Sequence, residues 1–242
     1  MKGHEPFNYD VDNNGRYVYT GPKARKSAIV ANNRQSEILH SLMSGKQPKS
    51  ILDLGCGDGT FTSEFLNFPN VKIVGMDPAE KAIKFASERY ALEDRISFTT
   101  TPAKDLISDG QFFDLVVLRG VLHHCEDPED VINQASRLSS AVLILEPNGL
   151  NPIMKIIEKL SPYHRAHSEK SFTRAKIRSW LVGSGLEIER FELGVLVPYF
   201  FPTFLVGFMS SLEPIVAKIP LVGRVLFGTQ VILASKNTFY KN

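Results

Sequence analysis

The stretch Ile51-Leu52-Asp53-Leu54-Gly55-Cys56-Gly57-Asp58-Gly59-Thr60 decides the fold of this 242-residue chain. An apolar run typical of a buried strand ends here in three glycines at alternate positions, and a helical pattern follows. Glycine tolerates the unusual φ angles of a tight turn, and its missing Cβ lets a ligand lie against the backbone. The amide groups at the start of the next helix favour a negative group such as a carboxylate. We therefore expect a strand–turn–helix unit that suits a nucleoside or dinucleotide ligand.

Short apolar runs alternate with helical stretches on both sides of this turn. Continuous runs of valine, isoleucine and leucine separated by helices are what a parallel sheet covered on both faces requires. The pattern therefore predicts a doubly wound α/β fold. We expect strands over residues 50–54, 71–76, 96–99, 113–118 and 141–146, and helices over 24–43 and from about Thr60, Ala79 and Pro128.

The later part of the chain departs from strict alternation. Asn151-Pro152 predicts a helix that runs to about Leu160, because asparagine caps helices and proline suits the first helical position. A further helix and two further strands would complete a mostly parallel, seven-stranded sheet within one domain over residues 1–242. The remaining predicted segments are a helix from 171–173 to Gly183 or Gly185, strands over 186–193 and 229–235, an N-terminal lid and helix over 1–45, and an apolar, proline-punctuated insertion over 195–227.

Composition and charge limit the class of function. The formal net charge of +2 gives no field that argues for nucleic acid as a partner. The two cysteines, Cys56 and Cys125, form no disulfide framework and match no metal-ligand spacing. Residues 1–6 lack the apolar run of a secretory signal, so the default expectation is a cytoplasmic protein.

Residues 193–212 form an uncharged run that is long enough on paper to cross a bilayer. Pro198 and Pro202 would break the hydrogen-bond ladder of a spanning helix, and the bilayer core has no water to repair it. The insertion 195–227 has four alternative roles. It roofs a pocket for a hydrophobic ligand, touches a membrane surface, buries itself in a dimer interface or extends the core. Peripheral membrane association thus stays open beside the cytoplasmic default.

A carboxylate at the end of the next strand narrows the choice of ligand. Asp77, in Met76-Asp77-Pro78, lies eighteen residues after Gly59, where a carboxylate can accept two hydrogen bonds from a ribose diol. The glycine spacing is G-x-G-x-G rather than the G-x-G-x-x-G of nicotinamide and flavin binders. Asp53, two residues before the first glycine, suits a cationic ligand and would repel a pyrophosphate.

The segment from Asp53 to Gly59, Asp-Leu-Gly-Cys-Gly-Asp-Gly, resembles the first motif of the class I S-adenosylmethionine (SAM)-dependent methyltransferases. Asp77 matches the ribose-binding acid of that family. Residues 113–118 are similar to its fourth strand and 121–124 to the turn after it. Phe172 onward, through 185–188, resembles the helix and strand that close the domain. The resemblance covers roughly residues 35–192 and the last strand.

The resemblance implies a SAM site beside the glycine turn. Asp53 would lie near the methionine ammonium group, and Asp77 would bind the ribose. Many relatives have an acidic residue just before the position of Ala103, where this chain has Pro102, so the adenine amino group needs another acceptor such as Asp105. The cofactor residues implied in this way are Asp53, Gly55, Cys56, Gly57, Gly59, Asp77, Pro78 against the adenine, the backbone of Ala103, and the carbonyl of Leu118 or Arg119.

His123 and His124 lie just beyond the carboxyl end of the fourth strand, where open α/β sheets place ligands. An imidazole there could take a proton from an acceptor hydroxyl, so we expect one of the two to act as a base. Alternatively, one of them caps the helix that starts near Asp127 or forms a hydrogen bond within the loop.

Several other side chains are candidates for contact with the methyl acceptor or for a lid. Arg119 binds an anionic acceptor or the methionine carboxylate, or it forms a surface ion pair. The N-terminal tyrosines Tyr9, Tyr17 and Tyr19 belong either to a lid over SAM or to an ordinary packed arm. The residues expected to contact the acceptor are Asn148, His164, His167 and Tyr199.

The predicted reaction is transfer of a methyl group from SAM to a small molecule, on oxygen or nitrogen. The insertion favours an apolar or lipid-linked acceptor. No metal is needed for this reaction, and the sequence has no ligand cluster for one. We expect a monomer or a homodimer and no nucleic-acid partner. Two alternatives stay open: a nicotinamide-dependent oxidoreductase, which the glycine spacing and Asp53 disfavour, and a non-catalytic SAM-binding scaffold associated with a membrane.

Overall fold

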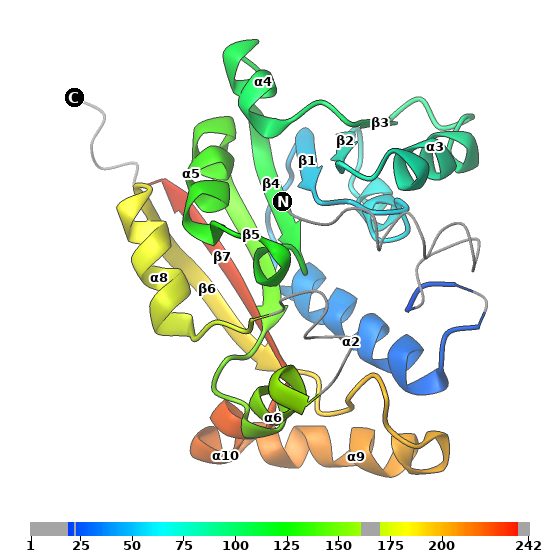
Figure 1. The fold of residues 1–242 in the computed structure, drawn as a ribbon, viewed down its shortest axis with the longest axis vertical. Helices are drawn as coiled ribbons and strands as arrows, with labels where there is room; N and C mark the ends of the chain where they lie inside the picture. The colour runs from blue at the N-terminus through cyan, green and yellow to red at the C-terminus, as the bar shows by residue number, and fades with distance from the viewer. Residues whose placement is uncertain (1–18, 22, 161–169, 237–242) are drawn as a thin grey trace.

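A seven-stranded sheet forms the centre of the computed structural model, which describes residues 19–21, 23–160 and 170–236 (Figure 1). The strands are β1 (Ser50–Leu54), β2 (Lys72–Met76), β3 (Ile96–Thr99), β4 (Phe113–Arg119), β5 (Ser139–Pro147), β6 (Leu186–Gly194) and β7 (Thr229–Lys236). They lie in the order β3-β2-β1-β4-β5-β7-β6. Strand β7 runs antiparallel to β5 and to β6, and the other neighbouring strands of this sheet are parallel. The predicted doubly wound, mostly parallel sheet is confirmed.

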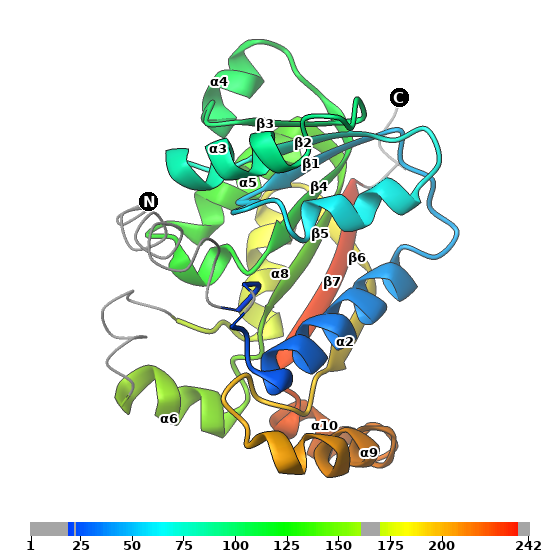
Figure 2. The ribbon, with the colours of Figure 1, turned by 90° about the vertical axis from the view of Figure 1, so that its right-hand side faces the viewer.

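Helices cover both faces of this sheet (Figure 2). The α-helices are α2 (Lys26–Leu42), α3 (Glu80–Arg89), α4 (Ala103–Ser108), α5 (Pro128–Leu138), α6 (Pro152–Leu160), α8 (Arg174–Gly183), α9 (Val206–Ala217) and α10 (Pro220–Leu226). The short 3-10 helices are η1 (Thr62–Asn67), η2 (Leu122–His124) and η3 (Thr203–Leu205). On one face α4, α5 and α8 pack on an apolar cluster of the sheet, and on the other face α2 and η1 pack on a second cluster.

Strand β4 shows why the central strands are continuously apolar. Val116 and Leu118 belong to the cluster under α5 and α8. Leu115 and Val117 belong to the cluster under α2. All four side chains are at most 2% exposed. Since successive residues of a strand point to opposite faces, a sheet covered on both faces needs apolar residues at every position.

The segment after the glycine turn differs from the prediction. It is the 3-10 helix η1 and not an α-helix from about Thr60. Phe68 ends η1 with an extended backbone (ψ 133°), because Pro69 disfavours helical angles in the residue before it. The sequence pattern also does not predict α4, since a helix of six residues has too little periodicity to recognise.

The insertion between β6 and β7 leaves and rejoins the sheet at neighbouring positions. Gly194 pairs with Thr229, and the N–H of Gly228 donates to the carbonyl of Val195 at 2.9 Å. Between these points the chain forms η3, α9 and α10. The uncharged run 193–212 is thus divided among β6, η3 and α9, and in the described part of the chain no helix is long and apolar enough to cross a bilayer.

The parallel strands end on the side of the molecule where α6, α9 and α10 lie. Strand β5 ends at Pro147, and α6 begins five residues later at Pro152. Figures 1 and 2 both show α6, α9 and α10 together at this end. We call the edge at which β1, β2, β4 and β5 end the carboxyl edge. Ligands of open α/β sheets bind at this edge.

Candidate active site

The turn after β1 is formed by three glycines in the left-handed region, with φ of +88° at Gly55, +55° at Gly57 and +73° at Gly59. Residues with a side chain rarely adopt such angles. A Cβ at Gly55 would lie 2.5 Å from Cγ2 of Val121, and one at Gly59 would lie 2.8 Å from Cζ of Phe98. Glycine is therefore required at these two positions both by the backbone angle and by the close approach of a neighbour.

The end of β1 is tied directly to the end of β2. The N–H of Gly55 donates to the carbonyl of Met76 at 2.7 Å. The Asp77 carboxylate accepts hydrogen bonds from the N–H groups of Gly57 and Ala79, both at 2.9 Å, and Asp77 is only 9% exposed. The structure thus brings the glycine turn and the carboxylate predicted to bind a ribose into direct contact.

Asp53 is a buried carboxyl group at the end of β1. Its exposed fraction is 3%, and the hydroxyl of Thr62 donates to Oδ2 at 2.6 Å. Burial raises the pKa of Asp53 to about 6, while the Thr62 hydrogen bond and the charge of Arg119 act in the opposite direction. A cation placed beside a desolvated carboxylate stabilises its charged form. The position of Asp53 is therefore suited to an ammonium group.

Arg119, at the end of β4, is a buried cation that joins α2 to η1. Its guanidinium donates to Glu64 Oε2 at 3.1 Å, to Ser36 Oγ at 3.1 Å and to the carbonyl of Asn32 at 3.3 Å. It also stacks 3.6 Å from the centre of the Phe61 ring. Burial lowers its pKa, and Glu64 opposes that shift. The side chain forms an ion pair at 8% exposure, so an anionic ligand would have to compete with Glu64.

The other residues predicted to bind the cofactor lie at or after the ends of β1, β2, β3 and β4. Pro78 follows Asp77 directly. Ala103 is the first residue of α4, and it packs in the same apolar cluster as Leu118 of β4. Cys56 is 8% exposed, and burial raises the pKa of its thiol well above the usual value. The thiol is therefore neutral and suits a packing role better than a nucleophilic one.

The turn after β4 carries a histidine paired with a buried glutamate. His123 Nδ1 lies 2.8 Å from Glu146 Oε2, and the Glu146 side chain is 0% exposed. Glu146 Oε1 accepts from the N–H groups of Val121 and Leu122 at 2.8 and 2.7 Å. An accepting carboxylate requires the ring proton on Nδ1, which leaves the lone pair of the neutral ring on Nε2. Glu146 thus fixes both the orientation and the tautomer of His123.

Glu146 is a site residue that was not predicted from the sequence. The available signal was a carboxylate closing the apolar run 142–145 at the carboxyl end of β5, beside β4 in the sheet. A buried carboxylate needs several hydrogen-bond donors, and a strand in the centre of a sheet offers them only at its end. The adjoining histidine turn supplies these donors.

His124 stacks against His123, with ring centroids 4.0 Å apart and an angle of 43° between the rings. The N-cap of α5 is Asp127 itself, whose side chain accepts from the N–H of Asp130 at 3.0 Å. The helix therefore does not need the histidine cap that was one predicted alternative. Burial, helped by the Glu146 charge, raises the pKa of the Cys125 thiol to about 12, so this thiol is neutral as well.

The glycine turn and the histidine turn are neighbours in space. Strands β1 and β4 pair directly, with Ile51 opposite Leu115. Val121, which precedes η2, lies so close to Gly55 that a Cβ on the glycine would overlap its side chain. A ligand bound along the glycine turn therefore has the turn that carries His123 beside it.

Residues 19–20 and the insertion meet near the glycine turn. The hydroxyl of Thr20 donates to Asp58 Oδ2 at 3.0 Å. The rings of Tyr19 and Tyr199 lie 4.9 Å apart between centroids. The Tyr199 hydroxyl lies 2.8 Å from Asn32 Oδ1 of α2, and burial raises its pKa. Four residues of the predicted lid and acceptor pocket lie outside the described residues: Tyr9, Tyr17, His164 and His167.

Asn148 anchors the insertion to the end of β5. Its Nδ2 donates to the carbonyls of Arg224 and Phe227, both at 2.9 Å. Asn151 repeats this role three residues later, with a bond to the carbonyl of Leu226 at 2.9 Å. Asn148 was predicted to contact the acceptor. Its side-chain amide instead donates hydrogen bonds to the insertion 195–227, the segment that would cover the acceptor.

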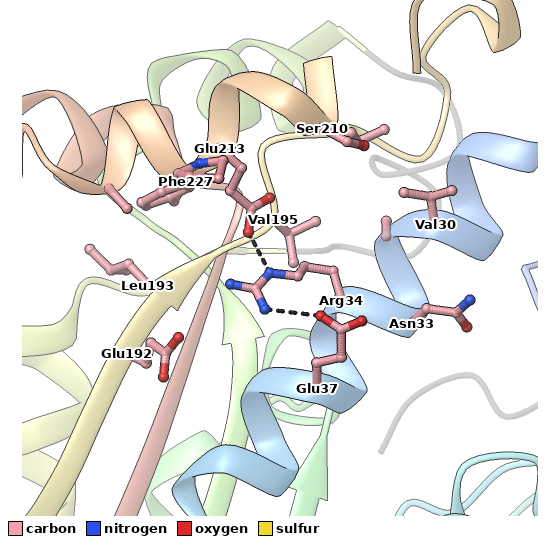
Figure 3. Close-up of a pocket in the computed structure, with 14 residues that line it drawn as sticks. Val30, Asn33, Arg34, Glu37, Glu192, Leu193, Val195, Ser210, Glu213 and Phe227 are labelled. Carbon is pink, nitrogen blue, oxygen red and sulfur yellow. Dashed lines mark hydrogen bonds and ion pairs between the residues drawn. The ribbon is translucent and has the colours of Figure 1, made fainter. Parts of the chain in front are cut away.

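A separate hollow of about 580 Å³ lies between α2, the end of β6 and α9 (Figure 3). Arg34 projects into it and donates to Glu213 at 2.5 Å and to Glu37 at 3.0 Å. The hollow is lined by neither the glycine turn nor the histidine turn. It is therefore distinct from the candidate site. Within the described ranges, no group of three or more histidine, cysteine or acidic side chains is arranged to hold a metal ion.

Residues 52–141 match the model of a family described as a methyltransferase domain. The match runs from β1 into β5 and contains the glycine turn, Asp77 and His123. The matched segment belongs to the class I SAM-dependent methyltransferase family. This membership agrees with the resemblance found in the sequence, and it makes the carboxyl edge the candidate active site of a methyltransferase domain.

Three curated relatives of this methyltransferase domain show how far the similarity extends. The 27-O-demethylrifamycin SV methyltransferase of Amycolatopsis mediterranei is 29% identical over 154 residues, which is 61% of this chain and 54% of that protein. The ubiquinone biosynthesis O-methyltransferase of Bordetella avium is 30% identical over 106 residues, 42% and 43% of the two chains. The tRNA U34 carboxymethyltransferase of Campylobacter jejuni is 30% identical over 92 residues, 38% and 32%. The matches thus span between about a third and about half of these relatives.

A solved structure shows the same fold over the whole length of the chain. The magnesium protoporphyrin IX methyltransferase of Synechocystis PCC 6803, with bound SAH, has a TM-score of 0.67 to the methyltransferase domain. The superposition covers 97% of this chain and 98% of that one at 19% sequence identity. At this identity the likeness concerns the fold.

Proposed function

We propose that this chain transfers the methyl group of SAM to a hydroxyl or amine of a small apolar molecule, with His123 as the base for a hydroxyl. The observation that carries the proposal is the 2.8 Å contact between His123 Nδ1 and the buried carboxylate of Glu146. His123 lies on the turn that contacts the glycine turn, and Glu146 lies at the end of β5 beside it. The turn that carries the proposed base therefore lies beside the proposed cofactor cradle at the carboxyl edge.

The residues at the ends of β1 and β2 fit SAM. The glycine turn offers a backbone surface without side chains, along which the methionine part would lie. The buried Asp53 carboxylate would hold the ammonium group, and Asp77 would bind the ribose. When bound, SAM supplies a methyl group on a positively charged sulfur, so the donor is already activated.

His123 is arranged to accept a proton at Nε2. The Glu146 carboxylate accepts the Nδ1 proton, holds the ring in place and stabilises the positive charge that appears when Nε2 becomes protonated. An acceptor hydroxyl would lose its proton to Nε2 as its oxygen bonds to the methyl carbon, while the bond from that carbon to sulfur breaks and S-adenosylhomocysteine leaves. An amine that arrives as the free base would need His123 only for the proton released afterwards.

An apolar small molecule is the acceptor class that best suits this chain. The names of its similar proteins refer to demethylrifamycin, ubiquinone biosynthesis and magnesium protoporphyrin. The net charge of +2 gives little attraction for a polyanion such as the tRNA named for another relative. The insertion 195–227 adds apolar side chains at the carboxyl edge, and contact with a membrane surface through it is part of the proposal.

Two measurements test this function. Thermal unfolding is compared with SAM, S-adenosylhomocysteine and NAD, because a ligand that binds the folded state raises the midpoint. We expect a rise with the first two ligands; a rise with NAD alone would replace the proposal by the oxidoreductase alternative. S-adenosylhomocysteine release is then followed with phenols, hydroquinones and amines of increasing apolar size. Cofactor binding without turnover on any of them would favour the scaffold alternative.

Glu146→Gln separates the base from the cofactor site. The amide keeps the size of the side chain but removes the charge that stabilises a protonated His123. We expect SAM affinity to stay unchanged while turnover of a hydroxyl acceptor falls. Equal turnover in the variant and the parent would remove His123 and Glu146 from the proposed mechanism.

A further inference from the structure

Three helices at the carboxyl edge expose apolar side chains at one end of the molecule, where α6, α9 and α10 lie together (Figures 1 and 2). Ten large apolar side chains of these helices and of their flanks are between 41% and 84% exposed. We call this surface the apolar end; its members are Leu150, Ile153, Ile156, Leu160, Phe204, Phe208, Ile215, Ile219, Leu221 and Val225.

The spacing of these residues gives each helix one exposed apolar stripe. In α6 the stripe is Ile153, Ile156 and Leu160, at positions i, i+3 and i+7, and this helix has no buried residue. In α9, Phe208 and Ile215 are seven residues apart, so they lie on one face of the helix. Figure 2 shows α6 at the same end of the molecule as the adjoining pair α9 and α10, but apart from that pair. Exposed apolar stripes on three helices at one end exceed the scattered apolar residues of an ordinary protein face.

The carboxylates of the three helices are turned to internal partners. Glu158 of α6 accepts from Lys155 at 3.0 Å and from the backbone and hydroxyl of Ser171. Glu213 of α9 is 9% exposed and bonds to Arg34 and to the N–H of Leu196. Among the described residues, these are the carboxylates that α6, α9 and α10 contain. The negative charge at this end is therefore neutralised within the protein.

The exposed charges on α6, on α10 and in the turn between α9 and α10 are positive. Lys159 lies in the last turn of α6, Lys218 lies between α9 and α10, and Arg224 lies in α10; all three are exposed. Exposed apolar stripes bordered by lysine and arginine are what a protein needs to lie in the interface of an anionic bilayer. A second copy of this chain would instead bring an equally positive border against this one, which opposes self-association.

We propose that the apolar end docks on the surface of an anionic lipid bilayer. The apolar side chains enter the boundary between headgroups and acyl chains, and Lys159, Lys218 and Arg224 lie next to the lipid phosphates. The surface includes α6, which lies outside the insertion 195–227. Asn148 and Asn151 join α6 and α10 through hydrogen bonds to the carbonyls of residues 224–227, so the two parts of the surface keep one relative placement.

Docking in this way places the candidate site next to the lipid. Strand β5 ends at Glu146 and Pro147, and the chain enters α6 a few residues later. The carboxyl edge, with the His123 turn, therefore faces the same side of the molecule as the apolar end. An apolar acceptor dissolved in the bilayer would reach His123 from that side, and this last step rests on the proposed function.

Flotation of the full chain with vesicles tests the docking surface. The vesicles are phosphatidylcholine alone and phosphatidylcholine with phosphatidylglycerol. We expect binding to the second kind, and loss of at least about tenfold in binding with Phe208→Glu or Ile156→Glu. Leu92→Glu is the matched control, because Leu92 is 99% exposed and lies beyond α3, outside the apolar end. The thermal midpoint of each variant shows that it is folded.

The contribution of the positive border is tested with Lys218→Gln and Arg224→Gln. Each substitution should weaken binding to the anionic vesicles by about fivefold, and added salt should reduce the difference. Equal binding to both kinds of vesicle, or an equal loss in Leu92→Glu, would overturn the proposal. So would absence of vesicle binding together with a dimer in sedimentation that Phe208→Glu dissociates.

The same variants distinguish this proposal from the proposed function. SAM binding, measured by the thermal shift, should be unchanged in Phe208→Glu. Vesicle binding by a chain that transfers no methyl group would leave the docking surface standing and remove the function. Methyl transfer without vesicle binding would support the proposed function and remove the docking surface.

Discussion

The carboxyl edge and the apolar end are neighbours that are built in opposite ways. At the carboxyl edge Asp53, Asp77 and Glu146 are buried polar groups with defined hydrogen-bond partners. At the apolar end large apolar side chains such as Phe204 and Leu221 are 84% and 76% exposed. Polar groups held in fixed positions suit a ligand of fixed shape. An exposed apolar surface suits a partner without fixed shape, such as the lipid bilayer proposed above. Substitutions at the edge should therefore alter chemistry and stability, and substitutions at the apolar end should alter neither.

The largest effect is expected for the proposed base. His123→Gln should lower turnover of a hydroxyl acceptor by about a thousandfold, because no group remains to take the proton in the transition state. His124→Gln is the matched control, since His124 packs against His123, whereas His123 is the histidine whose Nδ1 lies 2.8 Å from Glu146. Steady-state rates with SAM affinity from calorimetry measure both variants. Similar rates in the two variants would contradict the assignment of His123, rather than His124, as the base.

The next effect concerns the glycine turn. Gly55→Ala should lower the free energy of unfolding by about 3 kcal/mol, from a strained backbone angle and from overlap with Val121. Gly110→Ala, with φ of +69° and open space around the Cβ, carries the strain alone and should cost about 1 kcal/mol. Urea unfolding measures both. Equal losses of unfolding free energy in the two variants would show that the overlap with Val121 adds nothing to the cost of Gly55→Ala.

The Asp53 carboxylate should lower the free energy of unfolding at neutral pH, although it is proposed to bind the ammonium group of SAM. Its pKa is raised from 3.8 to about 6, so the folded protein binds this proton more tightly than the unfolded chain. Stability from this group falls as pH rises from about 4 to about 6, and the cost remains above that range. Asp53→Asn should therefore raise the unfolding free energy by about 2 kcal/mol near pH 7.5 and much less near pH 4.

The same variant should weaken SAM binding by about 1–3 kcal/mol, because a charge-assisted hydrogen bond is lost. Thermal midpoints at the two pH values and calorimetry with SAM check the pair of effects. A variant that is less stable than the parent at neutral pH, or one that binds SAM equally well, would contradict the role given to Asp53.

The smallest effect is expected at the apolar end. Phe208→Ser should change the free energy of unfolding by less than about 0.5 kcal/mol, since Phe208 is 64% exposed. Glu213→Gln, on the same helix, should cost about 1–3 kcal/mol because it breaks the ion pair with Arg34 and weakens the bond from the Leu196 N–H. A large loss in Phe208→Ser would mean that this face is part of the folded core.

The cofactor half of the site could be predicted from the sequence because it depends on local rules. The spacing of Gly55, Gly57 and Gly59 follows from backbone angles that only glycine adopts readily. Asp77 follows from its place at the end of a strand, and the parallel sheet brings it to Gly57 without further information. The boundaries of β1 and β3 agree with the prediction residue by residue for the same reason.

The acceptor half could not be predicted because it depends on contacts between distant segments. The pairing of His123 with Glu146 requires the register of β4 against β5 and the shape of the turn after β4. The ion pair of Arg119 with Glu64 requires the placement of η1. The exposure of the α6 stripe was also beyond reach, because an amphipathic pattern does not tell whether its apolar side meets protein or another medium.

Because β6 and β7 pair antiparallel, the segment between them leaves and rejoins the sheet at adjacent positions. Gly194 and Thr229 face each other at the strand ends, so a hairpin of a few residues would be enough to connect them. The length of the chain between residues 195 and 228 can therefore vary without a change in the register of β6 on β7. Under the proposed function, the choice of acceptor and of cellular surface can therefore diversify in evolution while the donor site is inherited unchanged.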